Sequence, residues 1–167
     1  MNTGFRPTGV QLMDEKKNKV TNLLGYLGLL PFAAATVLEV INADFMGKSG
    51  LTYFVTYSAV ILSFMAGTLW GKVLSANDEG GTAVAFIMSN IFALAAWVSL
   101  LMEMSLVTLV ILAAGFMLLW FTEKNPAVGQ STYCPITYGR LRRRLTFTVV
   151  ILHLIMLLQN TVMNGGA

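Results

Sequence analysis

The sequence predicts an all-α integral membrane protein, a bundle of five transmembrane helices with its N-terminus inside and its C-terminus outside. Three observations carry this prediction. The 167 residues are 56% hydrophobic and only 11% charged, whereas soluble domains average about 25% charged residues. The apolar residues form unbroken stretches long enough to span a bilayer, which takes about 20 helical residues. The basic residues gather on one side of these stretches.

The apolar stretches divide the chain into a polar N-terminal tail at residues 1–19, a membrane domain at 20–163 and a short outer tail at 164–167. The stretch from Thr82 to Phe121 contains one formal charge, Glu103, and as a single helix it would be about 60 Å long, twice the hydrocarbon thickness. It is therefore predicted to form two helices with a turn at Glu103. The predicted spans are residues 22–41, 51–73, 82–102, 105–121 and 145–163, and residues 122–144 form a cytoplasmic loop.

The basic residues test the number of spans independently of hydropathy. Lys and Arg accumulate in short loops on the cytoplasmic side of a membrane. Of the eleven basic residues, all except Lys48 fall in the N-terminal tail, the second loop or the fourth loop. These three segments share one side with five spans, whereas four or six spans would spoil the segregation. The charge pattern therefore favours five spans and places the N-terminus inside.

Small residues recur at every fourth position on the second predicted helix, and a similar stripe lies on the third. Small side chains let helix backbones approach closely in lipid. We therefore expect these two helices to pair, and a homodimer face is the alternative interpretation. The residues are Ala59, Ser63, Gly67 and Gly71 on the second helix, and Ala85, Ser89 and Ala93 on the third.

Polar residues are rare within the spans, and three of them fall at a similar depth. His153 lies near the middle of the fifth span, and Ser63 and Asn90 lie at corresponding positions of the second and third. Ionisable groups at this depth usually face the bundle interior. The three residues are a candidate intramembrane polar cluster. His153 is either a neutral, hydrogen-bonded core residue, a contact for haem or quinone, a proton-linked group or a lipid-exposed residue.

No metal site or catalytic residue is predicted. Cys134 is the only cysteine and His153 the only histidine, so a site built from several such ligands cannot come from this chain alone. The sequence also contains no Walker loop, dinucleotide fingerprint or HExxH motif. The prediction names no cofactor, and an enzyme is the least favoured function.

A basic cluster precedes the last span on the predicted inner side. Each such residue near an anionic membrane surface contributes about 1 kcal/mol. The cluster is predicted to anchor the topology and to bind anionic lipid such as cardiolipin. Nucleic acid is an improbable partner for so short a cluster next to a membrane. Its residues are Arg140, Arg142, Arg143 and Arg144.

Pro31 lies in the middle of the first predicted span, after Gly25 and Gly28. Proline lacks the backbone N–H and clashes with the preceding turn of a helix. A kink is therefore expected in this span, with one backbone carbonyl freed from its helical partner.

Several sequence blocks occur in the order and spacing of one protein family. They are Leu27-Gly-Leu-Leu-Pro-Phe32, Tyr57-Ser-Ala-Val-Ile-Leu-Ser-Phe64 with Trp70-Gly71, Ala96-Trp97, Ala113-Ala-Gly-Phe116, and Tyr138-Gly-Arg-Leu-Arg142 with Leu145-Thr146. With these blocks the chain, from Leu23 to Leu158, resembles the uncharacterised inner-membrane family of proteobacteria and mitochondria, a domain of unknown function, that includes mitochondrial transmembrane protein 69. The resemblance implies five spans and a bacterial or mitochondrial inner-membrane location. It implies no reaction.

The expected function is that of an accessory or structural inner-membrane protein. It would pack against itself or against a larger membrane complex, with membrane lipids as partners. The alternative is binding of a small molecule within the bundle (a quinone, haem or lipid) or transport of a small solute.

Overall fold

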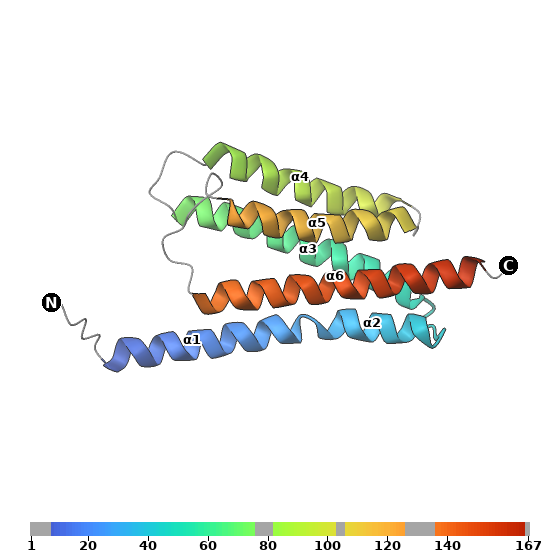
Figure 1. Ribbon diagram of the computed structural model, residues 1–167, viewed down its shortest axis with the longest axis horizontal. Helices are drawn as coiled ribbons and strands as arrows, with labels where there is room; N and C mark the ends of the chain where they lie inside the picture. The colour runs from blue at the N-terminus through green and yellow to red at the C-terminus, as the bar shows by residue number, and fades with distance from the viewer. Residues whose placement is uncertain (1–7, 76–81, 103–105, 126–135, 166–167) are drawn as a thin grey trace.

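The computed structural model describes residues 8–75, 82–102, 106–125 and 136–165. In these residues the structure contains six helices and no strand, and the helices make five apolar segments long enough to cross a membrane. The start of α1 and the end of α6 lie at opposite ends of the bundle (Figure 1), as five crossings require. The predicted five-span bundle is therefore confirmed. The helices are α1 (Thr8–Leu27), α2 (Leu30–Val40), α3 (Gly50–Ser75), α4 (Thr82–Leu101), α5 (Leu106–Lys124) and α6 (Ile136–Gly165).

The helix ends differ from the predicted spans, mostly on the basic side of the bundle. α1 begins at Thr8, within the predicted tail, and α6 begins at Ile136 rather than at 145. Hydropathy marks where charges begin, but a helix continues past that point because its backbone hydrogen bonds extend into the interface and long basic side chains reach water. The predicted loop 122–144 is therefore shorter. The predicted turn at 103–105 and parts of the tails and loops lie outside the described residues.

The first membrane segment is broken at Gly28 and Leu29, between α1 and α2. Pro31 occupies the first turn of α2, where proline is tolerated because an N–H there has no helical acceptor. The hydroxyl of Tyr57 on α3 donates to the carbonyl oxygen of Gly28 at 3.0 Å. Unsatisfied backbone groups are costly in a bilayer. The expected kink is confirmed, and Tyr57 supplies a partner for a carbonyl at the break.

Replacing Tyr57 by Phe should lower the free energy of unfolding by about 1–2 kcal/mol, because the Gly28 carbonyl loses a buried donor. Thermal unfolding of the purified protein in detergent micelles measures this loss. Tyr53 provides a matched control, since its hydroxyl also donates to a carbonyl, that of Phe45 at 2.9 Å, in an exposed position. An equal loss for Tyr53→Phe would contradict the special role of the break.

Two side chains cap the start of α3, and one of them, Glu39, comes from α2. The Glu39 Oε2 atom accepts a hydrogen bond from the backbone N–H of Leu51 at 2.7 Å, and Ser49 Oγ accepts one from that of Thr52 at 3.3 Å. These acceptors satisfy N–H groups that have no partner within the helix. At Gly50 the two helices are so close that a Cβ atom would collide with backbone atoms of α2.

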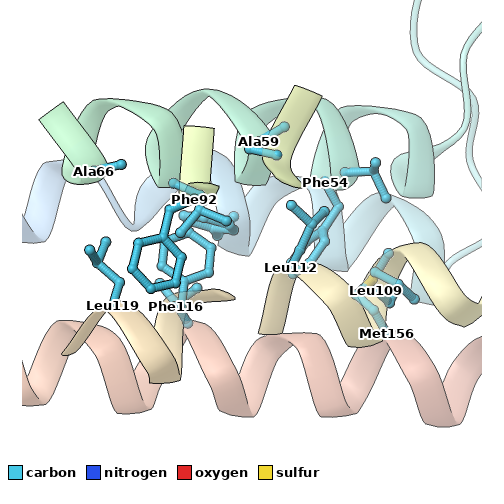
Figure 2. Packing of buried hydrophobic residues seen from close by; sticks show 14 of the residues in the cluster. Phe54, Ala59, Ala66, Phe92, Leu109, Leu112, Phe116, Leu119 and Met156 are labelled. Carbon is cyan, nitrogen blue, oxygen red and sulfur yellow. The ribbon is translucent and has the colours of Figure 1, made fainter. Parts of the chain in front are cut away.

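The core lies between α2, α3, α4, α5 and α6. Figure 2 shows Ala59 and Ala66 on α3 facing Leu112, Phe116 and Leu119 on α5. α4 packs along α3, with the Ser89 hydroxyl donating to the Ala66 carbonyl at 2.7 Å. The expected pairing of the second and third spans is confirmed. Large apolar side chains are exposed on every span, as a lipid-facing surface requires.

The predicted small-residue stripe on α3 is only partly at this interface. Ala59 is buried and Ser63 half-buried, but Gly67 and Gly71 are exposed, and a Cβ added at either glycine would meet nothing within 4 Å. Positions four apart drift by about 40° per step around a helix with 3.6 residues per turn. The stripe therefore rotates out of the contact with α4 as it continues along α3. At this level α4 contacts Ala66 instead of Gly67.

Candidate small-molecule cavity

A cavity of about 330 Å³ lies between α1, α2, α3, α5 and α6. This volume is at the lower end of the range for ligand pockets, about 300–1,000 Å³. Its deeper walls are apolar and include Phe32 and Phe116. Its polar side chains come from the parts of α1, α3 and α6 nearest the basic end of the bundle. These residues are Thr21, Thr68, Tyr138, Arg142 and Thr146.

An ion pair stands at the polar end of this cavity. The Nε atom of Arg142 on α6 lies 2.9 Å from Oε2 of Glu123 on α5, and their side chains are only 8% and 5% exposed. Thr68 Oγ1 on α3, which donates to Met65 O, lies 3.3 Å from the other Glu123 oxygen. The pair joins α5 to α6, and each charge compensates the other where water is excluded.

Arg142 differs from the other members of the predicted lipid anchor. Arg140, Arg143 and Arg144 are exposed, whereas Arg142 is 7% exposed and paired. A helix turns by about 100° per residue, so Arg142 shares the inward face of α6 with Thr146 and its successors, while the other three point elsewhere. For this reason Arg142 does not lie where the expected contact with lipid headgroups would place it. For the three exposed arginines it stays a prediction.

The pairing of Arg142 with Glu123 was not anticipated from the sequence. A signal existed, because the buried residues Val149 and His153 fall at helical spacing from Arg142 and mark the same face. The predicted last span begins at residue 145, so this face was not extended back to Arg142. An arginine on a buried helical face requires a counter-charge. Glu123 lies at the end of the preceding helix.

His153 is fully buried and lies in a shell of aromatic rings. Its Nδ1–H donates to the Val149 carbonyl at 2.8 Å. Ring centroids of Phe54, Phe116 and Phe32 lie 4.7, 5.7 and 6.2 Å from the imidazole. Phe32 and Phe116 also line the cavity, but His153 does not. The other ring nitrogen, Nε2, is buried and has no hydrogen-bond partner among the described residues.

The other two members of the predicted polar cluster have different surroundings. The side-chain amide of Asn90 is exposed on α4 and donates to the Phe86 carbonyl of its own helix at 2.9 Å. Ser63 is half-buried on α3. Among the contacts of the described residues, none joins Ser63, Asn90 and His153. The chemistry predicted for this cluster gains no geometric support, and the polar residues that do meet are Thr68, Glu123 and Arg142.

The architecture defines a class: a multi-pass α-helical membrane protein with a partly open cavity between its helices. The model of the family described as "Protein of unknown function (DUF3429)" matches residues 17–158, so the chain belongs to this family. The expected membership in a domain family of unknown function is confirmed. No curated protein and no solved structure matches the chain.

Proposed function

We propose that this protein is an accessory membrane protein that binds one amphipathic, lipid-like molecule in its bundle cavity. The observation that carries the proposal is the cavity's division into an apolar depth, with Phe32 and Phe116, and a polar end, with Arg142 and Thr146. Ligand pockets are mostly apolar, with a few placed polar groups that orient the ligand. A molecule with a polar head and an apolar body matches both regions.

Binding is favoured over catalysis by the chemistry of the walls. Among the described lining residues there is no carboxylate, thiol or imidazole. Proton transfer and covalent catalysis use such groups most often. The polar side chains available, those of Arg142 and three threonines among them, donate hydrogen bonds and orient a bound group.

The proposed location is the inner membrane of a bacterium or mitochondrion, with the polar end of the cavity on the cytoplasmic or matrix side. The basic residues support this orientation, because the ends of α1, α3, α5 and α6 that carry them lie together (Figure 1). The exposed Arg140, Arg143 and Arg144 would contact anionic headgroups there, cardiolipin included. The N-terminus is accordingly proposed to be inside.

A second proposal is association with another helix, in a homo-oligomer or a membrane complex. It is supported by Gly67 and Gly71, which are exposed on α3 and where an added Cβ would meet nothing within 4 Å. Small residues on an exposed face permit close helix contact in lipid. Replacing Gly67 by Leu should then shift an oligomer toward monomer in cross-linking of native membranes, and an unchanged pattern would oppose this proposal.

Native mass spectrometry of the purified full chain, released from a neutral detergent, tests the cavity. The expected result is an adduct with the mass of one lipid-sized molecule per chain. Replacing Met65, which lines the cavity, by Trp should reduce the adduct to less than about one fifth, because the indole occupies the space.

Val60 supplies the matched control for this experiment. It lies on the same helix and is 56% exposed toward lipid, so Val60→Trp should keep the adduct. Thermal unfolding checks that both variants are folded. Equal adduct in Met65→Trp and in the unaltered chain would exclude the cavity as the binding site.

A further inference from the structure

Among the described residues, the ion pair at the polar end of the cavity is neutral as a whole. Arg142 contributes one positive charge and Glu123 one negative charge, and their Nε and Oε2 atoms are 2.9 Å apart. Glu123 is not among the cavity-lining residues, whereas Arg142 is. Arg142 therefore lines the cavity while its charge is compensated by Glu123, a residue outside the lining.

Two hydrogen-bond donors at this end have no protein acceptor. Arg142 Nη2 and Thr146 Oγ1 are buried and have no hydrogen-bond partner among the described residues. The residues are 7% and 1% exposed, and both line the cavity. They are one helical turn apart on α6, so their side chains are neighbours on one face. Buried donors are satisfied in most native proteins, which makes this pair a place for a ligand's acceptor atom.

The Thr146 hydroxyl is unusual when compared with other hydroxyls in the membrane helices. Buried Thr and Ser side chains in such helices commonly donate to the carbonyl four residues earlier. Thr36 does so at 2.8 Å and Ser58 at 2.7 Å. Thr146 makes no such bond. Its hydroxyl is therefore a buried donor without an acceptor, on a residue that lines the cavity.

We infer that the cavity recognises an uncharged carbonyl oxygen, carried by a neutral apolar molecule such as a quinone or a glyceride ester. This inference rests on the proposed function and names its ligand class. The carbonyl would accept hydrogen bonds from Arg142 Nη2 and Thr146 Oγ1, with the apolar body directed toward Phe32 and Phe116. A carbonyl oxygen has two lone pairs, so it can accept hydrogen bonds from two donors.

An anionic head is disfavoured by the same geometry. A carboxylate or phosphate added beside the Arg142–Glu123 pair would leave a net negative charge in a site with little water. Burying an uncompensated charge costs several kcal/mol. The exposed arginines at the mouth attract anions, but they lie outside the buried site.

The experiment measures equilibrium binding to the purified full chain in dodecyl maltoside micelles, which contain no carbonyl group. The probes are decylubiquinone, dioleoylglycerol and oleate. At least one of the two neutral probes should bind more tightly than oleate. The neutral probe that binds more tightly shows whether the carbonyl belongs to a quinone or to a glyceride ester. Thr146→Val, which keeps the side-chain shape, should weaken neutral-probe binding about five- to tenfold. Thr148→Val is the matched control, exposed on the same helix, and should leave binding unchanged.

A second variant tests the role of charge. Glu123→Gln keeps the side-chain size but leaves Arg142 without a counter-charge, so the preference should shift toward oleate by at least about tenfold. Thermal unfolding shows whether the variant is folded. If Glu123→Gln does not fold, the double variant Arg142→Lys/Glu123→Gln replaces it, because it also keeps a cation without a counter-charge. An unchanged preference in a folded variant would overturn the inference.

The failure of the ligand class is distinguishable from the failure of the site. Tighter binding of oleate than of both neutral probes to the unaltered chain would overturn the carbonyl assignment and leave cavity binding intact. Equal weakening by Thr146→Val and Thr148→Val would overturn the role of the Thr146 hydroxyl. If no probe binds and the purified chain carries no adduct, the proposed function itself fails.

Discussion

A chain with Arg142 replaced by Met is expected to lose about 3–5 kcal/mol of its free energy of unfolding. The substitution leaves the Glu123 carboxylate buried without its cation, since the two side chains are only 8% and 5% exposed and 2.9 Å apart. An unpaired charge at such a position is far more costly than the loss of an exposed ion pair. Unfolding by titration with sodium dodecyl sulfate measures the change.

Two companion variants separate the charge effect from a general loss of arginine. Arg143 is exposed one residue further along α6, so Arg143→Met should change the free energy of unfolding by less than about 0.5 kcal/mol. In the double variant Arg142→Met/Glu123→Met, most of the lost stability should return, because no buried charge remains. A double variant as unstable as Arg142→Met would contradict the ion-pair explanation.

Substitution of Gly50 by Ala should destabilise the protein by about 3 kcal/mol, which is large for a single methyl group. The added Cβ would run into the carbonyl oxygen of Ala35 and the backbone nitrogen of Glu39. These are backbone atoms of α2, so no side chain can rotate away to make room. The helices must separate, and the Glu39 cap on Leu51 N–H is then lost as well.

Gly67 gives the control for this prediction, because it lies on the same helix with nothing within 4 Å of an added Cβ. Gly67→Ala should be neutral or slightly stabilising, since alanine has the higher helix propensity. Thermal unfolding in micelles compares the two variants. Similar melting temperatures for Gly50→Ala and Gly67→Ala would show that the α2–α3 contact is less tight than described.

The fold was largely predictable because bilayer thickness imposes a length on every apolar segment. The split of the stretch from Thr82 to Phe121 into α4 and α5 followed from that length alone. The break before Pro31 followed from the missing N–H. The start of α6 did not, because Arg140 and its neighbours reduce hydropathy without ending a helix.

The candidate site was predicted less well than the fold. His153 was correctly expected inside the bundle, but depth along a helix does not say which side chains meet. Asn90 lies at a similar depth and is exposed. Contact depends on the rotation of each helix about its axis, and that rotation follows from packing with its neighbours. Only the packed structure directs Arg142 toward Glu123 and away from the headgroups.

The sequence by itself determined that the chain is a five-span membrane bundle, where its spans lie and where its first helix breaks. These properties depend on local quantities: the apolar length, the charge of each loop and the chemistry of proline. The tertiary structure alone decided that Arg142 is buried, that Gly67 is exposed and that a cavity forms beside Thr146. These depend on the relative rotation of packed helices, because side chains one residue apart on a helix point about 100° apart.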